Sequence, residues 1–145
     1  MLRFSVGAAE VTGNHEERIR SDLCGQSVIE KENVVASCDI AKRHCLPCEG
    51  GAPPLNDAQS RQLLAGLTDW RMIGGKLDRT FVFENHYEVM AFVNAIAWVS
   101  HRENHHPELT VGYKDCGVSY WTHAIGGLSE NDFICAAKLE KLLVL

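Results

Sequence analysis

The sequence predicts an α+β domain with the element order αββαββα, in which helices cover one face of an antiparallel four-stranded sheet. Two pairs of short strand-like segments occur in the chain, and a helical pattern stands before, between and after these pairs. Strand pairs that alternate with single helices are typical of antiparallel sheets with the helices in one layer.

The stretch Glu49–Pro54 marks the expected start of this domain, because its glycines and prolines continue neither a helix nor a central strand. The only aromatic residue upstream of it is Phe4, so residues 1–48 lack core material. We expect residues 1–48 to form a flexible, disordered lead and residues 49–145 to form the folded domain.

The first helix and the first strand pair follow this boundary. Asn56 is a good N-cap for a helix of about ten residues with three leucines on one side. Segments 70–73 and 76–83 are the expected strands. Gly74-Gly75 joins them, and this dipeptide readily takes the positive φ angles of a hairpin turn.

A long helix, a second strand pair and a last helix complete the domain. Asn85 is the expected N-cap of the long helix, which runs to about Arg102 because a proline follows soon after. Segments 109–113 and 118–123 are the second strand pair, with Gly117 in the connection. Ser129 and Asp132 resemble a capping box that opens the last helix.

Composition excludes several classes of function. The 145 residues carry a formal charge of −5 and 46% of them are hydrophobic, which is typical of one soluble globular domain. No run of Lys and Arg offers a surface for phosphates, so direct nucleic-acid binding is not expected. No stretch reaches the roughly 18 uninterrupted apolar residues of a membrane span, and no signal peptide is recognisable. We therefore expect a cytoplasmic protein without membrane contact.

Four of the seven histidines lie in one short stretch and are the candidate chemical groups. His101 and His105 are four residues apart and are expected on one face of a helix end, while the next proline turns His106 outward. His123 is expected to end a strand. Asp132, at the start of the last helix, is expected to lie with it beside the other histidines. Imidazoles titrate near neutral pH, so the cluster predicts general acid and base catalysis.

Two alternatives stay open for these residues. Asp132 could serve only as a helix cap, because unpaired amides stabilise a carboxylate in the first turn. His101 and His105 could share a zinc ion with His123 or Cys116, although the Glu that follows the first His in zinc protease helices is absent.

The six cysteines have no regular spacing and are expected to be reduced. Cys45 and Cys48 form one CxxC pair beside His44. No second pair follows, and isolated pairs are common in sequences, so we do not expect metal there.

The spacing of the histidines resembles the signature of a known family. The run consists of His101, His105-His106-Pro107, Tyr113, His123 and Asp132. In these positions the chain is similar to the pterin-4a-carbinolamine dehydratases, also called 4a-hydroxytetrahydrobiopterin dehydratases. The resemblance extends from about Leu55 to the C-terminus, and Cys45 and Cys48 are similar to the N-termini of some bacterial members.

The resemblance implies the αββαββα fold, a dimer formed by extending the sheet, and often a tetramer formed by helix packing. It implies a lyase that removes water from 4a-hydroxytetrahydrobiopterin to give quinonoid dihydropterin. Such a reaction recycles the cofactor of aromatic amino acid hydroxylases, which makes a hydroxylase a candidate partner. No metal and no cofactor of the protein's own is implied.

The resemblance also assigns roles to single residues. His105 and His123 are expected to be the acid and base around the 4a-hydroxyl, and His106 to position the pterin. Asp132 is expected to orient His123 or to hold its charge, and Trp70 to lie at the edge of the pocket.

His101 is expected at the periphery of the substrate site, because many members have an acidic residue in its place. A non-catalytic binding module of the same fold is the alternative function, since family members also assist transcription factors. The three imidazoles favour catalysis, because a pure adaptor has no use for them.

Overall fold

The structure is a computed structural model that describes residues 40–48 and 53–143. Its elements in chain order are α2 (Asp57–Leu64), β1 (Arg71–Ile73), β2 (Lys76–Val82), α3 (His86–Glu103), β3 (Glu108–Val111), β4 (Asp115–Tyr120), the 3-10 helix η1 (His123–Ile125) and α4 (Glu130–Leu142). The predicted α+β class and the order αββαββα are confirmed.

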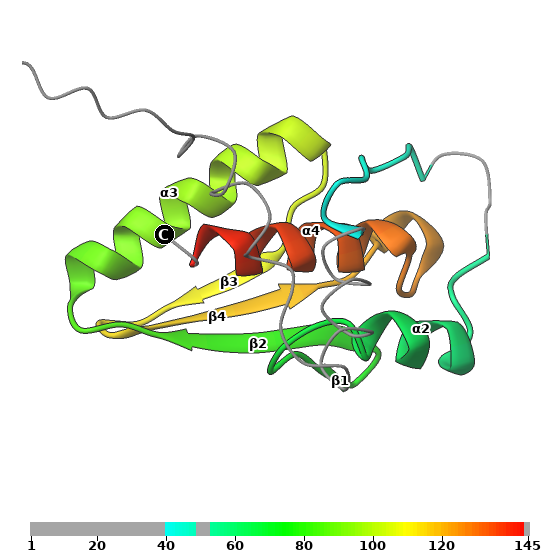
Figure 1. Ribbon diagram of the computed structural model, residues 1–145, viewed down its shortest axis with the longest axis horizontal. Helices are drawn as coiled ribbons and strands as arrows, with labels where there is room; N and C mark the ends of the chain where they lie inside the picture. The colour runs from blue at the N-terminus through cyan, green and yellow to red at the C-terminus, as the bar shows by residue number, and fades with distance from the viewer. Residues whose placement is uncertain (1–39, 49–52, 144–145) are drawn as a thin grey trace, which may run out of the picture.

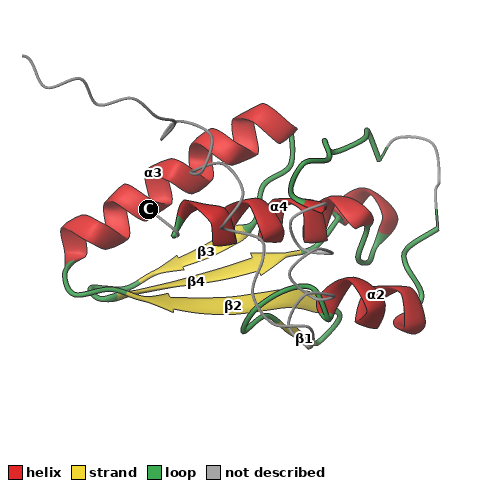
Figure 2. Cartoon of the chain, viewed as in Figure 1, coloured by secondary structure: helices red, strands yellow, loops and turns green. Residues whose placement is uncertain are grey.

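The four strands pair antiparallel in the order β1-β2-β4-β3, so β1 and β3 are the edges of the sheet (Figure 1). Leu77 and Phe81 of β2 lie opposite Tyr120 and Cys116 of β4, and all four are buried. Alternate residues of a strand point to the same face, so these side chains define the inner face of the sheet. Helices α3 and α4 lie on this side (Figure 2).

Turn residues explain where the strands meet. Gly74 and Gly75 have φ angles of 58° and 81° and form the predicted hairpin turn between β1 and β2. The prediction that Gly117 lies in the connection from β3 to β4 is wrong. Gly117 lies inside β4, and that connection is made by residues 112–114.

Helix α3 begins and ends at asparagines. The side chain of Asn85 caps its first turn as predicted. Asn104 takes the left-handed conformation, with φ 49° and ψ 38°, and ends the helix after Glu103. His105 therefore lies beyond the helix, and the prediction that it shares a helix face with His101 is wrong.

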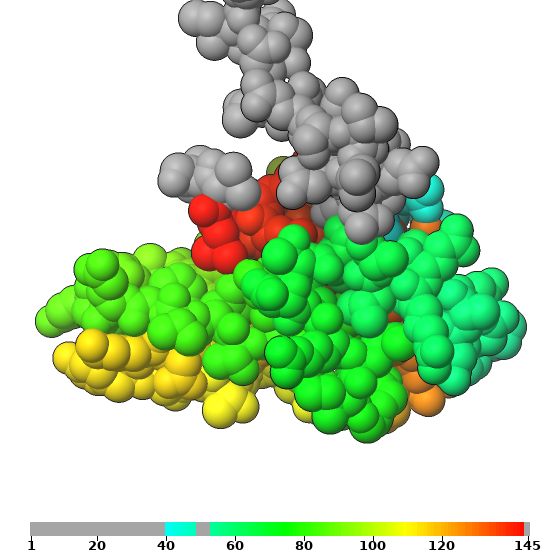
Figure 3. Space-filling model, turned by 60° about the horizontal axis from the view of Figure 1, so that its bottom comes forward, coloured from blue at the N-terminus to red at the C-terminus, as the bar shows by residue number. Residues whose placement is uncertain are grey.

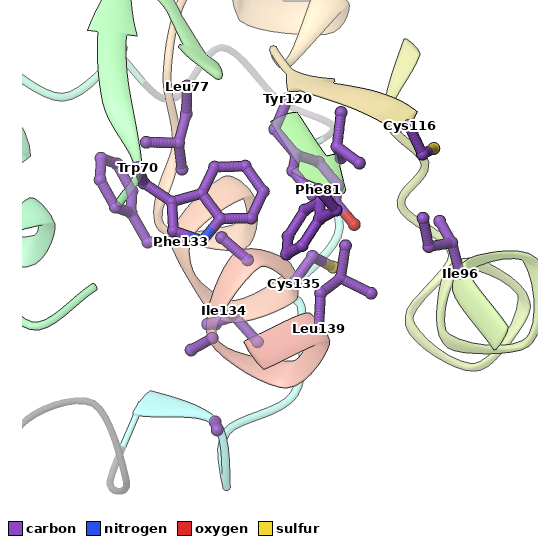
Figure 4. Close-up of a cluster of buried hydrophobic side chains, with 14 of the residues drawn as sticks. Trp70, Leu77, Phe81, Ile96, Cys116, Tyr120, Phe133, Ile134, Cys135 and Leu139 are labelled. Atoms are coloured by element: carbon purple, nitrogen blue, oxygen red, sulfur yellow. The ribbon is translucent and has the colours of Figure 1, made fainter. Parts of the chain in front are cut away.

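The core lies between the sheet and the two helices α3 and α4 (Figure 4). Trp70 is 4% exposed, and its ring contacts those of Phe81 and Tyr120 at centroid distances of 5.9 and 6.0 Å. Phe133 of α4 is completely buried in the same cluster. Aromatic rings in such edge-on and tilted arrangements contribute strongly to core stability.

Part of the expected lead packs on the domain. Ile40 and Ala41 are 6% and 9% exposed and belong to the core, and residues 45–48 contact the end of α3 and the start of α4. The domain start expected at residue 49 therefore excludes residues that the structure places against the domain. Residues 1–39, the rest of the expected lead, lie outside the described residues.

Two properties of the surface bear on association. All four residues of the edge strand β3 are exposed, and the yellow residues that include this strand lie at the surface in Figure 3. Among residues 40–48 and 53–143, no helix is long and apolar enough to cross a membrane.

Candidate active site

A cavity of about 270 Å³ opens where three parts of the chain meet: the end of α3, the connection from β4 to α4, and the segment of residues 45–48. Three of the histidines singled out in the sequence, His105, His106 and His123, line it. Binding sites for small molecules are hollows of this kind that contain a few convergent polar groups.

His105 is bound to a buried carboxylate. Its Nε2 lies 2.7 Å from Oδ1 of Asp132, and the two side chains are 10% and 0% exposed. A carboxylate only accepts hydrogen bonds, so Nε2–H of His105 donates to Asp132. The neutral ring then has its lone pair on Nδ1, where it can accept a proton.

The carboxylate of Asp132 is itself fixed by its neighbours. Its Oδ2 accepts hydrogen bonds from the backbone N–H of Ser129 at 2.7 Å and from the hydroxyl of Thr122 at 2.8 Å. The first of these bonds is the capping contact predicted for the start of α4. Asp132 is therefore both the helix cap of one interpretation and the histidine partner of the other.

The ring of His105 has little freedom to rotate. It stacks on Tyr120 with a centroid distance of 5.8 Å and an interplanar angle of 8°. Tyr120 is completely buried, so the stacking surface is part of the core. Stacking and the bond to Asp132 together hold the imidazole in one orientation at the cavity wall.

His123 and His106 are more exposed than His105. The side chain of His123 is 62% exposed, packs edge-on against Trp121 at 4.3 Å, and has its Nε2 4.0 Å from Glu108. The hydrogen bond and charge of Lys76, with smaller effects of His123 and His106, lower the pKa of Glu108. The carboxylate of Glu108 is thus an anionic neighbour of both exposed imidazoles.

Two residues expected in the substrate site lie outside the cavity lining. Trp70 is buried in the core between Phe81 and Tyr120. His101 is exposed on α3 with its ring 6.1 Å from that of Trp98.

Asp132 was expected to orient His123, but the structure pairs it with His105. The two-histidine zinc pair needs His101 and His105 on one helical turn, and the end of α3 at Glu103 separates them. In the described part of the chain, no three His, Cys, Asp or Glu side chains are grouped so that they could hold a metal ion.

Sequence reasoning missed three residues that line the cavity, Glu103, Thr122 and Asn131, and one beside it, Glu108. Glu108 has a sequence signal, since it directly follows His106-Pro107. Thr122 and Asn131 directly precede His123 and Asp132, which are residues that the spacing had singled out. Glu103 had no such signal, because two of its partners, His44 and Cys45, lie in the segment expected to be outside the domain.

The sequence is similar to a known protein family and to several individual relatives. The family described as Pterin 4 alpha carbinolamine dehydratase matches residues 53–142. A relative from Dechloromonas aromatica (strain RCB) is 68% identical over 110 residues, which cover 76% of this chain and 98% of the relative. A relative from Nitrosomonas eutropha (strain DSM 101675 / C91 / Nm57) is 58% identical over 108 residues, which cover 74% of this chain and 96% of the relative. The names of both relatives assign them to the pterin-4-alpha-carbinolamine dehydratases.

A solved structure has a similar fold. It is the crystal structure of transcriptional coactivator/pterin dehydratase from Brucella Melitensis, with a TM-score of 0.60 and 24% identity. The match covers 61% of this chain and 97% of that chain. At this identity the likeness supports the fold alone.

Proposed function

Because the chain belongs to the pterin-4a-carbinolamine dehydratase family of hydro-lyases, we propose that it removes water from a 4a-hydroxytetrahydropterin with His105, His106 and His123. The observation that carries this proposal is the bond between His105 and the buried Asp132 at the wall of a cavity that His123 also lines.

The reaction needs one acid and one base. The bond between C4a and the hydroxyl oxygen breaks while an acid protonates that oxygen, so that water leaves. A base takes a proton from a ring nitrogen, and the electron pair of the N–H bond forms the new double bond of the quinonoid dihydropterin. No oxidant or reductant is consumed, and groups with pKa values near 7 suit both proton transfers.

The roles that we propose for the three imidazoles follow from how deeply each side chain is buried. His105 has its Nε2 bound to Asp132, which leaves Nδ1 as the atom that exchanges a proton with the substrate. His123, an exposed residue of the same cavity lining whose Nε2 lies 4.0 Å from Glu108, is the second proton-transfer group. His106 positions the pterin.

The proposal extends to the setting of the reaction. The substrate is the form of tetrahydropterin left after an aromatic amino acid hydroxylase has acted, so the product returns to the hydroxylase cofactor pool. We also propose a homodimer in which the exposed edge strand β3 pairs with its copy, because an exposed, unpaired strand edge favours such pairing. A tetramer through helix packing is the larger assembly.

The competing function is a binding module without catalysis. Such a module would gain the helix cap from Asp132, but it would have no use for the imidazole that this buried carboxylate fixes at the cavity wall. The His105–Asp132 pair therefore favours catalysis over binding alone.

The test is the dehydration rate of histidine variants. The pterin substrate is generated in a hydroxylase reaction, and the decay of its absorbance is followed with His105→Ala, His123→Ala and the double variant. Each acid or base contributes roughly 10²- to 10⁴-fold, so each single variant loses about that factor and the double variant loses nearly all acceleration. His86→Ala, at the far end of α3, is the matched control and should retain the wild-type rate. A double variant with the wild-type rate would overturn the proposal.

A further inference from the structure

Residues 44–48, here called the wall segment, are held by two side chains of the domain. The backbone N–H of Cys45 donates to Oε2 of Glu103 at 2.9 Å. The backbone of Leu46 is bound at both ends by Asn131, whose Oδ1 accepts from its N–H at 3.1 Å and whose Nδ2 donates to its carbonyl at 2.7 Å. Two side chains thus fix the backbone of consecutive residues in the wall segment.

Glu103 and Asn131 are unusual residues for these positions. They are 8% and 7% exposed and lie at the end of α3 and the start of α4, where apolar side chains would suffice for helix packing. A buried carboxylate needs compensation, which Glu103 receives from Lys138 at 3.1 Å and from Cys45. The side chains of Glu103 and Asn131 make most of their hydrogen bonds with the wall segment, which indicates that they hold this segment in place.

The wall segment forms one side of the cavity that the three imidazoles line. Cys45, Leu46, Pro47 and Cys48 all contribute to the lining, and the end of Leu46 is free, since this residue is 73% exposed. In Figure 1 the cyan residues of this segment lie between the end of α3 and the start of α4. An apolar, exposed side chain beside polar imidazoles suits the face of a flat heterocycle whose edge carries the reacting groups.

The wall segment also belongs to the part of the chain shared with relatives. The alignment with the Dechloromonas aromatica relative spans 110 residues, whereas 93 residues lie between Pro53 and the C-terminus. The shared region therefore extends upstream of Pro53 and into the described segment, although the family match itself begins at residue 53.

From these contacts we infer that the wall segment is a binding surface for the pterin ring, and that Glu103 and Asn131 are positioning residues that act through it. This inference rests on the proposed function and adds the residues that determine substrate affinity. Neither Glu103 nor Asn131 bonds to His105, His123 or Asp132 through its side chain, so their loss should weaken binding and spare the proton transfers.

The experiment compares KM and kcat for Asn131→Ala and Leu46→Asp with the wild type. Leu46→Asp places a charge on the proposed binding surface, and the exposure of Leu46 means that this change leaves the core intact. Both variants are expected to raise KM by about tenfold and to keep kcat within about twofold, which is the signature of lost ground-state and transition-state binding. Asn94→Ala, exposed on α3, is the matched control and should change neither constant.

A binding measurement separates this inference from the proposed function. Affinity for 7,8-dihydrobiopterin, a stable pterin, is measured by fluorescence for the same proteins, together with their melting temperatures. Weaker pterin binding in both variants, with Asn94→Ala unchanged, supports the inference even if the wild type shows no dehydration, which alone would refute the proposed function. Unchanged KM and unchanged pterin affinity in Leu46→Asp would overturn the inference, as would an Asn131→Ala variant that loses only melting temperature or only kcat.

Discussion

Replacing Asp132 with Asn tests whether this carboxylate orients the catalytic imidazole. Its Oδ2 accepts from the Ser129 N–H and the Thr122 hydroxyl, and its Oδ1 accepts from His105. An amide has one oxygen, and the two donors on the Ser129 side favour placing it there. The amide NH₂ then faces Nε2 of His105, which must accept instead of donate. The neutral ring moves its proton to Nδ1, and the lone pair needed at the cavity is lost.

The expected size of the effect follows from this tautomer change. A misplaced general acid or base costs roughly 10²- to 10⁴-fold in rate, so Asp132→Asn should lose about that factor in kcat. Stability should fall by about 1.5–3 kcal/mol for the weakened charged hydrogen bonds, with about 0.3–1 kcal/mol more for the lost helix-terminus charge. Stopped-flow absorbance gives the first quantity and urea unfolding gives the second.

Asp57→Asn is the matched control for this variant. Asp57 is also an acidic residue in the first turn of a helix, α2, and it is exposed. This control should lose only the helix-terminus contribution and keep the wild-type rate. If Asp132→Asn retained a rate within about threefold of the wild type, the orientation argument for His105 would be refuted.

Three further predictions concern other groups. Burial by itself raises the pKa of Glu103, but the hydrogen bonds from Cys45 and Lys138 and the charge of Lys138 together outweigh it and lower this pKa below its ordinary 4.5. The stabilising effect of the ionised Glu103 is therefore present above pH 4.5 and is lost as the pH falls through the lowered pKa. The difference in unfolding free energy between wild type and Glu103→Gln should therefore be larger at pH 7 than at pH 3. The hydrogen bond with Cys45 and burial raise the pKa of the Cys135 thiol, so mass spectrometry should find its alkylation in the native protein slower than that of Cys48. Trp70→Phe should lower stability by about 1–3 kcal/mol in urea unfolding and leave KM unchanged, because Trp70 lies in the core; a raised KM would place it at the substrate instead.

Local sequence rules predicted much of the fold. The caps at Asn56 and Asn85, the glycine hairpin and the cap at Asp132 depend on neighbouring residues only, and the structure has each of them. The strand order β1-β2-β4-β3 could not be obtained this way, because it depends on pairing between segments far apart in the chain.

The sequence predicted which residues form the site, but not which of them bind one another. The spacing of His105, His123 and Asp132 in the sequence predicted that they lie close together, but it did not indicate which imidazole the carboxylate binds. That choice depends on Asn104, whose left-handed conformation ends α3 and turns His105 toward the start of α4. An asparagine in that conformation is permitted by sequence and is not dictated by it.

There is a physical reason why the sequence did not predict that the wall segment packs on the domain. Its contribution comes from backbone groups held by Glu103 and Asn131, and these partners lie 58 and 85 residues away in sequence. Composition detects apolar and aromatic side chains that build a core, whereas backbone groups bound by distant side chains leave no compositional signal.

The central claim is tested most directly by the rate at which the wild-type protein consumes 4a-hydroxytetrahydropterin. The substrate is generated by a hydroxylase, and its absorbance decay is recorded over a range of protein concentrations. The account predicts a decay rate that increases in proportion to the added protein, above the uncatalysed decay. A rate that stays at the uncatalysed value at every concentration would contradict it.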